Sequence, residues 1–509
     1  MVTGIIDASA AGVQTFSSTR AADLTPAERG ALAIQVLGRT APVSELARRH
    51  NVSRPFLYRQ AHAASEALHS RFAPPPADPD VLFYLPVTQE WLRQFVLALA
   101  LEGHAPFRGI QAIAESLLDY DGLSLGSIHT IIQEAAAQAR RINQAEDLSA
   151  VRVGVHDEIF QARRPVLVGI DARSTYCYLL ADEDHRDETT WGTHLLDLER
   201  RGFHPDYTIA DGGAALRAGQ RAACPDVACH GDVFHAERDM GQLAVYLENR
   251  ALGVIAARQK AQSRLNRALR PYSRKRHLCS TLARRLDAAR LQEQEAIRLA
   301  DDIRTLADWM REDILASAGP DLDTRRRLFD FVVEELLRRE RSCPHRIAPV
   351  RRMLQSQRDS LLAFVAVLQE RYEDLAARFD APVFLVQAVA ENEGRDPNSP
   401  ARWRRECRLR RQLGHRFHQV QVAVRQVLAE TPRASSLVEN LNSRLRGYFF
   451  LRRQIGNGYL DLLRFFLNHR RFPRSDRPER VGRSPAELLS GRPHQHWLEL
   501  LGHRRFHRN

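Results

Sequence analysis

Lysine, cysteine and long apolar runs are all scarce in this chain, and each scarcity excludes something. Only Lys260 and Lys275 are lysine among 74 basic residues. Such a ratio is typical of a GC-rich genome, although arginine is also the better bidentate phosphate ligand. The six cysteines are scattered, and a chain of 509 residues needs no disulfide framework. No apolar run approaches the roughly 20 residues of a membrane helix, and no secretory signal is visible. We therefore expect a soluble, cytoplasmic protein without a membrane partner.

What the sequence does have is positive charge. The net charge is +12 and the sequence pI about 9.8. A basic chain of this size favours a polyanionic partner, and DNA or RNA comes first. Its length suffices for three or four domains, and its 44% apolar content permits large cores.

The first domain, residues 1–72, is predicted to be helical. Thr25, Pro26 and Glu28 form a capping box with proline at the first helical position. Residues 43–59 then read as helix, short turn and second helix, which is the helix-turn-helix pattern. An ordinary helical hairpin is the alternative. The expected DNA-binding residues here are Arg48, Ser53, Arg54, Tyr58 and Arg59, with Ser53 also the N-cap.

A proline-rich linker at 73–79 separates this domain from a second helical domain at 80–148. Its two helices flank an Asp-Gly turn and are similar to a second, less basic helix-turn-helix. This pattern fits either a domain that acts as a structural spacer or one that binds DNA.

From Val151 the apolar period changes to two, which predicts strands. Three strands, a helix, and then alternating strand and helix up to residue 235 is the order of a ribonuclease-H-like α/β core. Residues 236–430 return to helical spacing and predict a large all-α insertion, in which only 382–387 is ambiguous. The core resumes with a last helix and a basic tail at 431–509. The expected fold is thus multidomain α and α/β.

Three acidic residues are the candidate catalytic and metal-binding residues: Asp157, Asp211 and Glu439. The first two end strands and the third lies on a helix, so their carboxylates can converge. Carboxylate oxygens suit Mg²⁺ or Mn²⁺, and two such ions about 4 Å apart can clamp both oxygens of a phosphodiester reaction. Asp171 also ends a strand and is the rival for the first ligand.

Glu439 opens an amphipathic helix. Its apolar stripe is Leu437, Leu441, Leu445 and Phe449. Glu439, Asn442 and Arg446 share the other side, where they suit a metal and DNA phosphate. Alternatively, Ser436 and Glu439 form a capping box, and the glutamate serves only the helix terminus.

Asp232 and His235 follow the last expected strand as possible active-site support. His235 suits a positioning role near the metals, or a buried structural role. A zinc reading would use Cys224, Cys229, His230 and His235, but their spacing matches no common zinc site.

Taken in order, these motifs resemble those of bacterial insertion-sequence DDE transposases over residues 20–492. The second-aspartate region is similar to that of hAT and Mutator-like enzymes, and the long interval from Asp211 to Glu439 is similar to their inserted helical domain. The resemblance implies a transposase that binds terminal inverted repeats and target DNA, cleaves and transfers strands with Mg²⁺ or Mn²⁺, and forms a homodimer or higher oligomer on nucleoid DNA. The alternatives are a metal-dependent nuclease or integrase without end pairing, and a domesticated DNA-binding protein with an inactive core.

Overall fold

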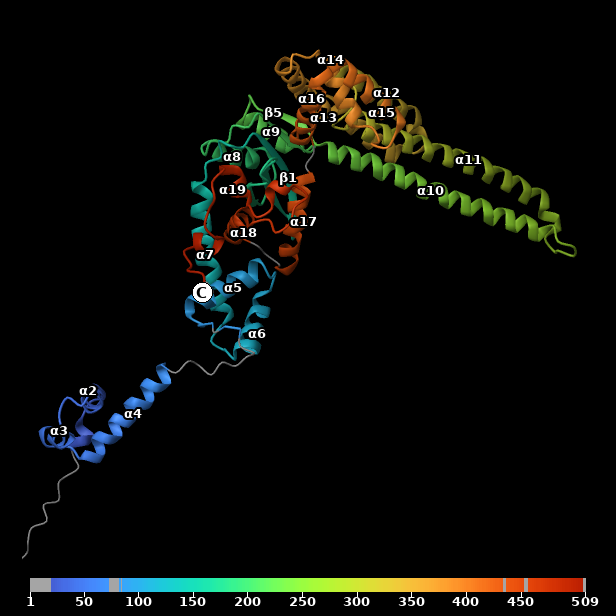
Figure 1. Cartoon of the computed structure of the whole chain (residues 1–509). Helices are drawn as coiled ribbons and strands as arrows, with labels where there is room; N and C mark the ends of the chain where they lie inside the picture. The colour runs from blue at the N-terminus through green and yellow to red at the C-terminus, as the bar shows by residue number, and fades with distance from the viewer. Residues whose placement is uncertain (1–19, 73–81, 84, 434–435, 453–455, 507–509) are drawn as a thin grey trace, which may run out of the picture. The chain divides into compact units, whose positions relative to one another are not determined.

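Two compact units make up the chain, residues 1–86 and 87–509. The computed structural model describes residues 20–72, 82–83, 85–433, 436–452 and 456–506. Most of them are helical, and a single five-stranded mixed sheet lies in the second unit (Figure 1). Within the part of the chain that is described, no helix is both long enough and apolar enough to cross a membrane. All six cysteines are free thiols.

In its described residues, the first unit contains four helices around a small core. They are α1 (Arg20–Asp23), α2 (Pro26–Leu37), α3 (Val43–His50) and α4 (Arg54–Phe72). The expected capping box begins α2, with the Glu28 N–H donating to Thr25 Oγ1 over 3.3 Å. Asn51 ends α3 in the left-handed region at φ 50°. The core side chains are Leu32, Leu46, Phe56 and Leu57.

The sheet of the second unit has the order β3-β2-β1-β4-β5. Its strands are β1 (Val153–Gln161), β2 (Arg164–Asp171), β3 (Cys177–Asp182), β4 (Tyr207–Ala210) and β5 (Ala228–Gly231). The first three are antiparallel, whereas β4 runs parallel to β1 and β5 runs parallel to β4. Ala162 and Arg163, at φ 49° and 74°, form the two-residue turn between β1 and β2. The strands expected at 151–230 are confirmed, with ends shifted by one or two residues.

Helices cover both faces of the sheet. On one face lie α8 (Glu188–Glu199) and α9 (Ala214–Ala223), around a core that includes Trp191 and Phe203. The other face packs in one core with α17 (Ser436–Leu451) and α18 (Asn457–His469). Short helices follow at η5 (Pro478–Arg480), α19 (Pro485–Ser490) and α20 (Trp497–Leu500).

The helices expected as a second domain at 80–148 belong to that same core. They are α5 (Gln89–Leu101), α6 (Phe107–Leu118) and α7 (Leu125–Ala145). Their buried side chains, such as Leu97, Ile110 and Ile128, share a hydrophobic cluster with β1 and α18. They have no separate core because their apolar faces are already covered by these elements.

The edge strand β3 is covered along its length by α18. Asn468 pairs with both the N–H and the C=O of Cys177, each over 2.8 Å. Asn457 pairs in the same way with Asp182, over 2.8 and 3.1 Å. Eleven residues of helix and five of strand both span about 16 Å, which lets two asparagines on one helix reach both ends of the strand. This contact closes the sheet edge to further pairing.

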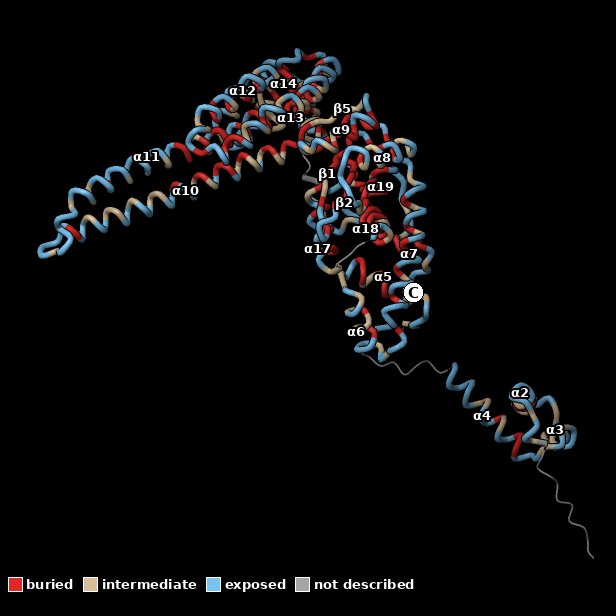
Figure 2. The backbone as a smooth tube through the Cα atoms, turned by 180° about the vertical axis from the view of Figure 1, so that it is seen from behind, coloured by how far each residue is buried: buried red, intermediate tan, exposed pale blue. Residues whose placement is uncertain are grey.

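Between residues 233 and 430, every regular element is a helix, and these helices build a core of their own (Figure 2). The elements are α10 (Val233–Ala268), η1 (Arg276–Leu278), α11 (Cys279–Trp309), the π-helical η2 (Met310–Ile314), α12 (Leu322–Arg339), η3 (Glu340–Ser342), α13 (Pro344–Arg378), α14 (Val383–Glu393), α15 (Pro400–Leu413), η4 (Gly414–Arg416) and α16 (Phe417–Glu430). The ambiguous segment 382–387 is the start of α14. Contact with the sheet runs through α13, where a Cβ on Gly231 would lie 3.0 Å from the Leu361 nitrogen.

Candidate active site

Three aspartates occupy equivalent positions on three neighbouring parallel strands. The sheet register aligns His156 of β1 with Ala210 of β4, and Ala210 with Gly231 of β5. The residue after each of these is an aspartate: Asp157, Asp211 and Asp232. The Asp232 N–H donates to the Ala210 carbonyl over 3.0 Å, which extends the alignment one step beyond β5.

Asp157 is buried, at 9% exposure. Its Oδ1 accepts from the Glu158 N–H over 2.8 Å, and its Oδ2 accepts from Asn442 Nδ2 over 2.8 Å. Burial raises the pKa of Asp157 to about 6, and the nearby charges of Asp211 and Glu439 push it in the same direction. The Glu158 N–H and His235 oppose that rise. Asp157 therefore holds its proton more tightly than an ordinary aspartate.

Asp211 lies directly after β4 and is partly exposed. Its Oδ1 accepts from the Gly213 N–H over 2.9 Å, and its backbone carbonyl accepts from Arg217 Nε over 3.0 Å. Gly212 follows Asp211, and its backbone is packed closely against the protein itself, because a Cβ there would clash with Gln357 Nε2.

Glu439 reaches the cluster from the first turn of α17. Its Oε1 lies 4.0 Å from His235 Nε2 and 3.7 Å from Arg238 Nη1, and its Oε2 lies 3.9 Å from Arg446 Nη2. All three separations exceed hydrogen-bond length, so the carboxylate is surrounded by positive charge without being locked in place. The expected stripe residues Leu441, Leu445 and Phe449 are buried. The side chains of Ser436 and Leu437, which belong to the capping-box alternative and the stripe, lie outside the described residues.

Asn442 has a different place from the one expected. We predicted that it would contact DNA, but it is 2% exposed and its amide donates to Asp157. It lies one turn from Glu439 on the packed side of α17, where the helix meets β1. Its Oδ1 is buried and accepts no hydrogen bond from any described group. Arg446, in contrast, is exposed as a DNA contact requires.

Asp232 and His235 form a bonded pair at the start of α10. Asp232 caps the helix by accepting from the Phe234 N–H over 3.0 Å, and its other oxygen is bonded to His235 Nδ1. Burial lowers the pKa of His235, but the bond and the charge of Asp232 outweigh burial and raise it overall. The pair therefore presents the far ring nitrogen of His235 toward Glu439.

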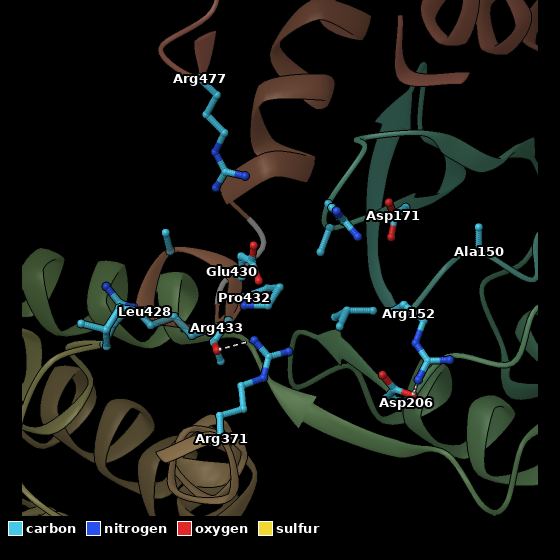
Figure 3. A pocket seen from close by; sticks show the side chains of 16 residues that line it. Ala150, Arg152, Asp171, Asp206, Arg371, Leu428, Glu430, Pro432, Arg433 and Arg477 are labelled. Carbon is cyan, nitrogen blue, oxygen red and sulfur yellow. Dashed lines mark hydrogen bonds and ion pairs between the residues drawn. The ribbon is translucent and has the colours of Figure 1, made fainter. Parts of the chain in front are cut away.

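Asp171 does not join the cluster. Its carboxylate accepts from the Ser174 N–H and hydroxyl over 2.7 and 2.6 Å at the end of β2. It faces a different cavity, of about 390 Å³, whose lining contains neither Asp157, Asp211 nor Glu439 (Figure 3). The arginines that line this cavity are Arg152, Arg173, Arg371, Arg433 and Arg477. Several are engaged within the protein, Arg152 with Asp206 at 2.5 Å and Arg371 with the Thr431 hydroxyl at 3.2 Å.

The carboxylate cluster is open in its present geometry. Across the described residues, no three histidine, cysteine or acidic side chains are close enough to hold a metal ion together. The donor set nevertheless suits Mg²⁺ or Mn²⁺, since it consists of carboxylates plus the unpaired amide oxygen of Asn442.

The residues expected to contact DNA in the first unit are on the surface of α3 and α4. Arg48, Arg54, Tyr58 and Arg59 are exposed. The hydroxyl of Ser53 accepts from the Phe56 N–H over 3.2 Å, which confirms the predicted N-cap.

Sequence reasoning missed Arg238, which places a guanidinium beside Glu439. The signal was present, because Arg238 follows His235 by three residues on one helix and such residues share a face. The chain matches no protein-family model, and no curated protein matches it.

Proposed function

We propose that this chain is a DDE-type transposase, which cleaves DNA and transfers strands at the site of Asp157, Asp211 and Glu439. The observation that carries the proposal is the parallel register of β1 and β4, since it aligns two aspartates on neighbouring strands. A helix that follows a long insertion then supplies the third carboxylate.

The order of the elements supports a ribonuclease-H-like core. Three strands, a helix, a strand, a helix and a strand precede the insertion, and α17 follows it. The antiparallel first three strands and the parallel last two fit the same fold.

Each residue of the site has a distinct task in this proposal. Divalent ions, when bound, would activate the attacking oxygen and stabilise the leaving one. Asp157, Asp211 and Glu439 would hold them, and Asn442 fixes the orientation of Asp157 through its amide. Arg446 is exposed beside Glu439 and can contact a phosphate.

Two reactions follow at one site. First, the oxygen of water attacks phosphorus, the bond from phosphorus to O3′ breaks, and O3′ takes a proton to become a free hydroxyl. That hydroxyl then attacks a phosphodiester of target DNA, so a new bond to phosphorus forms as the target strand breaks. Both are in-line displacements with the same charge distribution, so one set of carboxylates serves both.

The first unit would supply recognition of the terminal inverted repeats. Helices α3 and α4, joined by the left-handed turn at Asn51, are consistent with a helix-turn-helix. Exposed Arg54, Tyr58 and Arg59 lie on the second of these helices. Pairing of two element ends would require a homodimer or higher oligomer on the DNA.

The test uses the full-length protein with labelled duplexes from both genomic flanks of its coding sequence. Cleavage is followed with Mg²⁺ or Mn²⁺, and strand transfer is followed by joining to a supercoiled plasmid. Asp157→Asn, Asp211→Asn and Glu439→Gln should each lower cleavage at least 100-fold while leaving gel shifts unchanged. Asp171→Asn is the matched control, since it changes a buried strand-end aspartate outside the cluster.

Several outcomes would decide against the proposal. If the Asp211→Asn variant cleaves DNA at the wild-type rate, the DDE mechanism is wrong. Cleavage without joining would favour a nuclease, and joining without paired ends would favour an integrase. Specific DNA binding without cleavage under any metal would favour a domesticated DNA-binding protein.

A further inference from the structure

The insertion carries a helical arm made of α10 and α11. At 1.5 Å per residue, the 36 residues of α10 span about 54 Å. Figures 1 and 2 both show the two helices side by side, with their far ends extending beyond the other helices of the insertion. The near end of α10 carries His235 and Arg238 of the candidate active site. One continuous helix therefore connects the carboxylate cluster to the far end of the arm.

Most of the net positive charge of the protein lies at that far end. Residues 260–290, here named the arm tip, hold ten arginines and lysines and one acidic residue, Asp287. Their net charge of +9 compares with +12 for the whole chain, so all other residues together contribute only +3. Both lysines of the protein, Lys260 and Lys275, are also here.

These charges are exposed, and nine of the ten have no carboxylate partner among the described residues. Within the described part of the chain, one basic side chain of the arm tip, Arg290, pairs with a carboxylate, that of Asp287 at 3.3 Å. The remaining nine are exposed: Lys260, Arg264, Arg267, Arg270, Arg274, Lys275, Arg276, Arg284 and Arg285.

Nearer the body, the same two helices neutralise their charges. Arg258 pairs with Glu293 at 2.8 Å, and Arg304 pairs with Glu248 at 2.7 Å. Along one hairpin, the charges are paired near the body and largely unpaired at the tip. The unpaired tip arginines form no ion pairs that would stabilise the two helices, so helix stability alone does not require them.

We propose that the arm tip binds the phosphate backbone of duplex DNA, as a contact separate from α3 and α4. The partner class rests on the proposed function, since a DNA strand at the carboxylates would run within reach of the arm. At 3.4 Å per base pair, a 54 Å helix reaches DNA about 16 base pairs from the cleavage point. Because arginine and lysine contacts to phosphate read no sequence, this contact would hold flanking DNA whatever its sequence.

Two other partners fit the arm tip less well. Two copies of the tip would repel each other, since both carry unpaired positive charge. An anionic membrane surface would require a continuous exposed apolar face. The exposed apolar side chains here, Leu269, Tyr272 and Leu278, are single positions at the end of the hairpin.

The experiment measures binding of the full-length protein to a 60-base-pair duplex of arbitrary sequence, in EDTA, as a function of salt. The arm-tip variant combines Arg264→Gln, Arg267→Gln, Arg274→Gln, Lys275→Gln and Arg276→Gln. If these side chains contact phosphates, the negative slope of log K against log salt should become less steep by about 4.5, since each contact contributes about 0.9. Affinity near 150 mM salt should fall at least tenfold.

The matched control removes five exposed arginines scattered over the insertion outside the arm, namely Arg326, Arg327, Arg341, Arg352 and Arg395. An unchanged slope in the arm-tip variant, or an equal fall in the control, would overturn the proposal. So would loss of binding to phosphatidylglycerol vesicles without any change in DNA binding. Circular dichroism checks that both variants keep their helices. The binding assay is run in EDTA, which prevents cleavage, so it does not depend on catalytic activity. A failed cleavage assay with Mg²⁺ or Mn²⁺ would therefore refute the proposed chemistry and leave the measured DNA binding of the arm tip unchanged.

Discussion

Asn442 and Asp157 are 285 residues apart in the sequence, yet the amide of one donates to the carboxylate of the other over 2.8 Å. This bond ties α17, which carries Glu439, to the strand that carries the first aspartate. With the Glu158 N–H on Oδ1, it means that both oxygens of Asp157 accept a hydrogen bond. Four predictions follow from these contacts and from those of the sheet edge and the first unit.

Asp157→Asn should stabilise the metal-free protein at pH 8 and leave its stability unchanged at pH 4. The pKa of Asp157 is about 6 in the folded chain against 3.8 for a free aspartate. Its protonated form is therefore favoured by folding, and that stability is lost as pH rises from about 4 through 6. One pKa unit corresponds to 1.36 kcal/mol, so the variant should gain up to about 3 kcal/mol at pH 8. Urea unfolding in EDTA at both pH values measures the difference.

Adding Mn²⁺ at pH 8 provides the control for that experiment. Wild type should gain stability by binding the ion, and the variant should gain less, so the gap narrows. If the variant is less stable than wild type at pH 8 in EDTA, ionisation of Asp157 does not reduce the free energy of unfolding, and the prediction is wrong.

Asn442→Asp should destabilise the protein in a pH-dependent way. It places a second carboxylate at hydrogen-bond distance from Asp157, and two such groups cannot both ionise freely. We expect a loss of about 2–3 kcal/mol at pH 8 and a much smaller loss at pH 5, where the pair shares a proton. Asn442→Ala is the comparison, with a loss of about 1–2 kcal/mol at either pH. Equal losses for both variants at both pH values would argue against close contact with Asp157.

Asn468→Leu should cost more stability than Asn457→Leu. Both asparagines pair with backbone groups of β3, but the bonds of Asn468 are buried and those of Asn457 are exposed. A buried backbone group left without a hydrogen-bond partner costs about 1–3 kcal/mol of stability. We therefore expect Asn468→Leu to lose about 2–5 kcal/mol and Asn457→Leu to lose under about 1 kcal/mol. Heat denaturation of the two variants gives the ranking, and the reverse order would contradict the role of Asn468 at the sheet edge.

Arg54→Ala with Arg59→Ala should weaken binding to the flanking genomic duplexes. If both side chains contact phosphate, the salt slope falls by about 2. If they read base edges, discrimination against arbitrary DNA falls by about 1–3 kcal/mol for each contact. Arg71→Ala, at the far end of α4, is the control and should bind as wild type does. Unchanged binding by the double variant would shift recognition to α5–α7.

Local sequence patterns determined most of the secondary structure. Alternating valines from Val151 predicted β1, and a capping box predicted the start of α2. Such patterns depend on neighbours a few residues apart, and the structure confirms both. The same patterns could not decide 382–387, where a short apolar run fits a strand or a buried helix until its packing partners are known.

The sequence also supplied the candidate carboxylates, but not the choice between Asp157 and Asp171. Both were expected to end strands, but Asp157 lies inside β1 and only Asp171 ends its strand. The pairing of β1 with β4 brings Asp157, not Asp171, beside Asp211. Strand pairing depends on residues some 50 positions apart, which no local pattern encodes.

The tertiary structure alone decided the roles of Asn442 and of residues 80–148. Asn442 lies on a helix face that reads as polar, and it is buried because β1 covers that face with Asp157. The helices of 80–148 read as a domain, and they join the core because α18 and the sheet leave an apolar surface that their own apolar faces fill. In both cases the deciding contact comes from a distant segment, and its energy is gained only when the whole chain has folded.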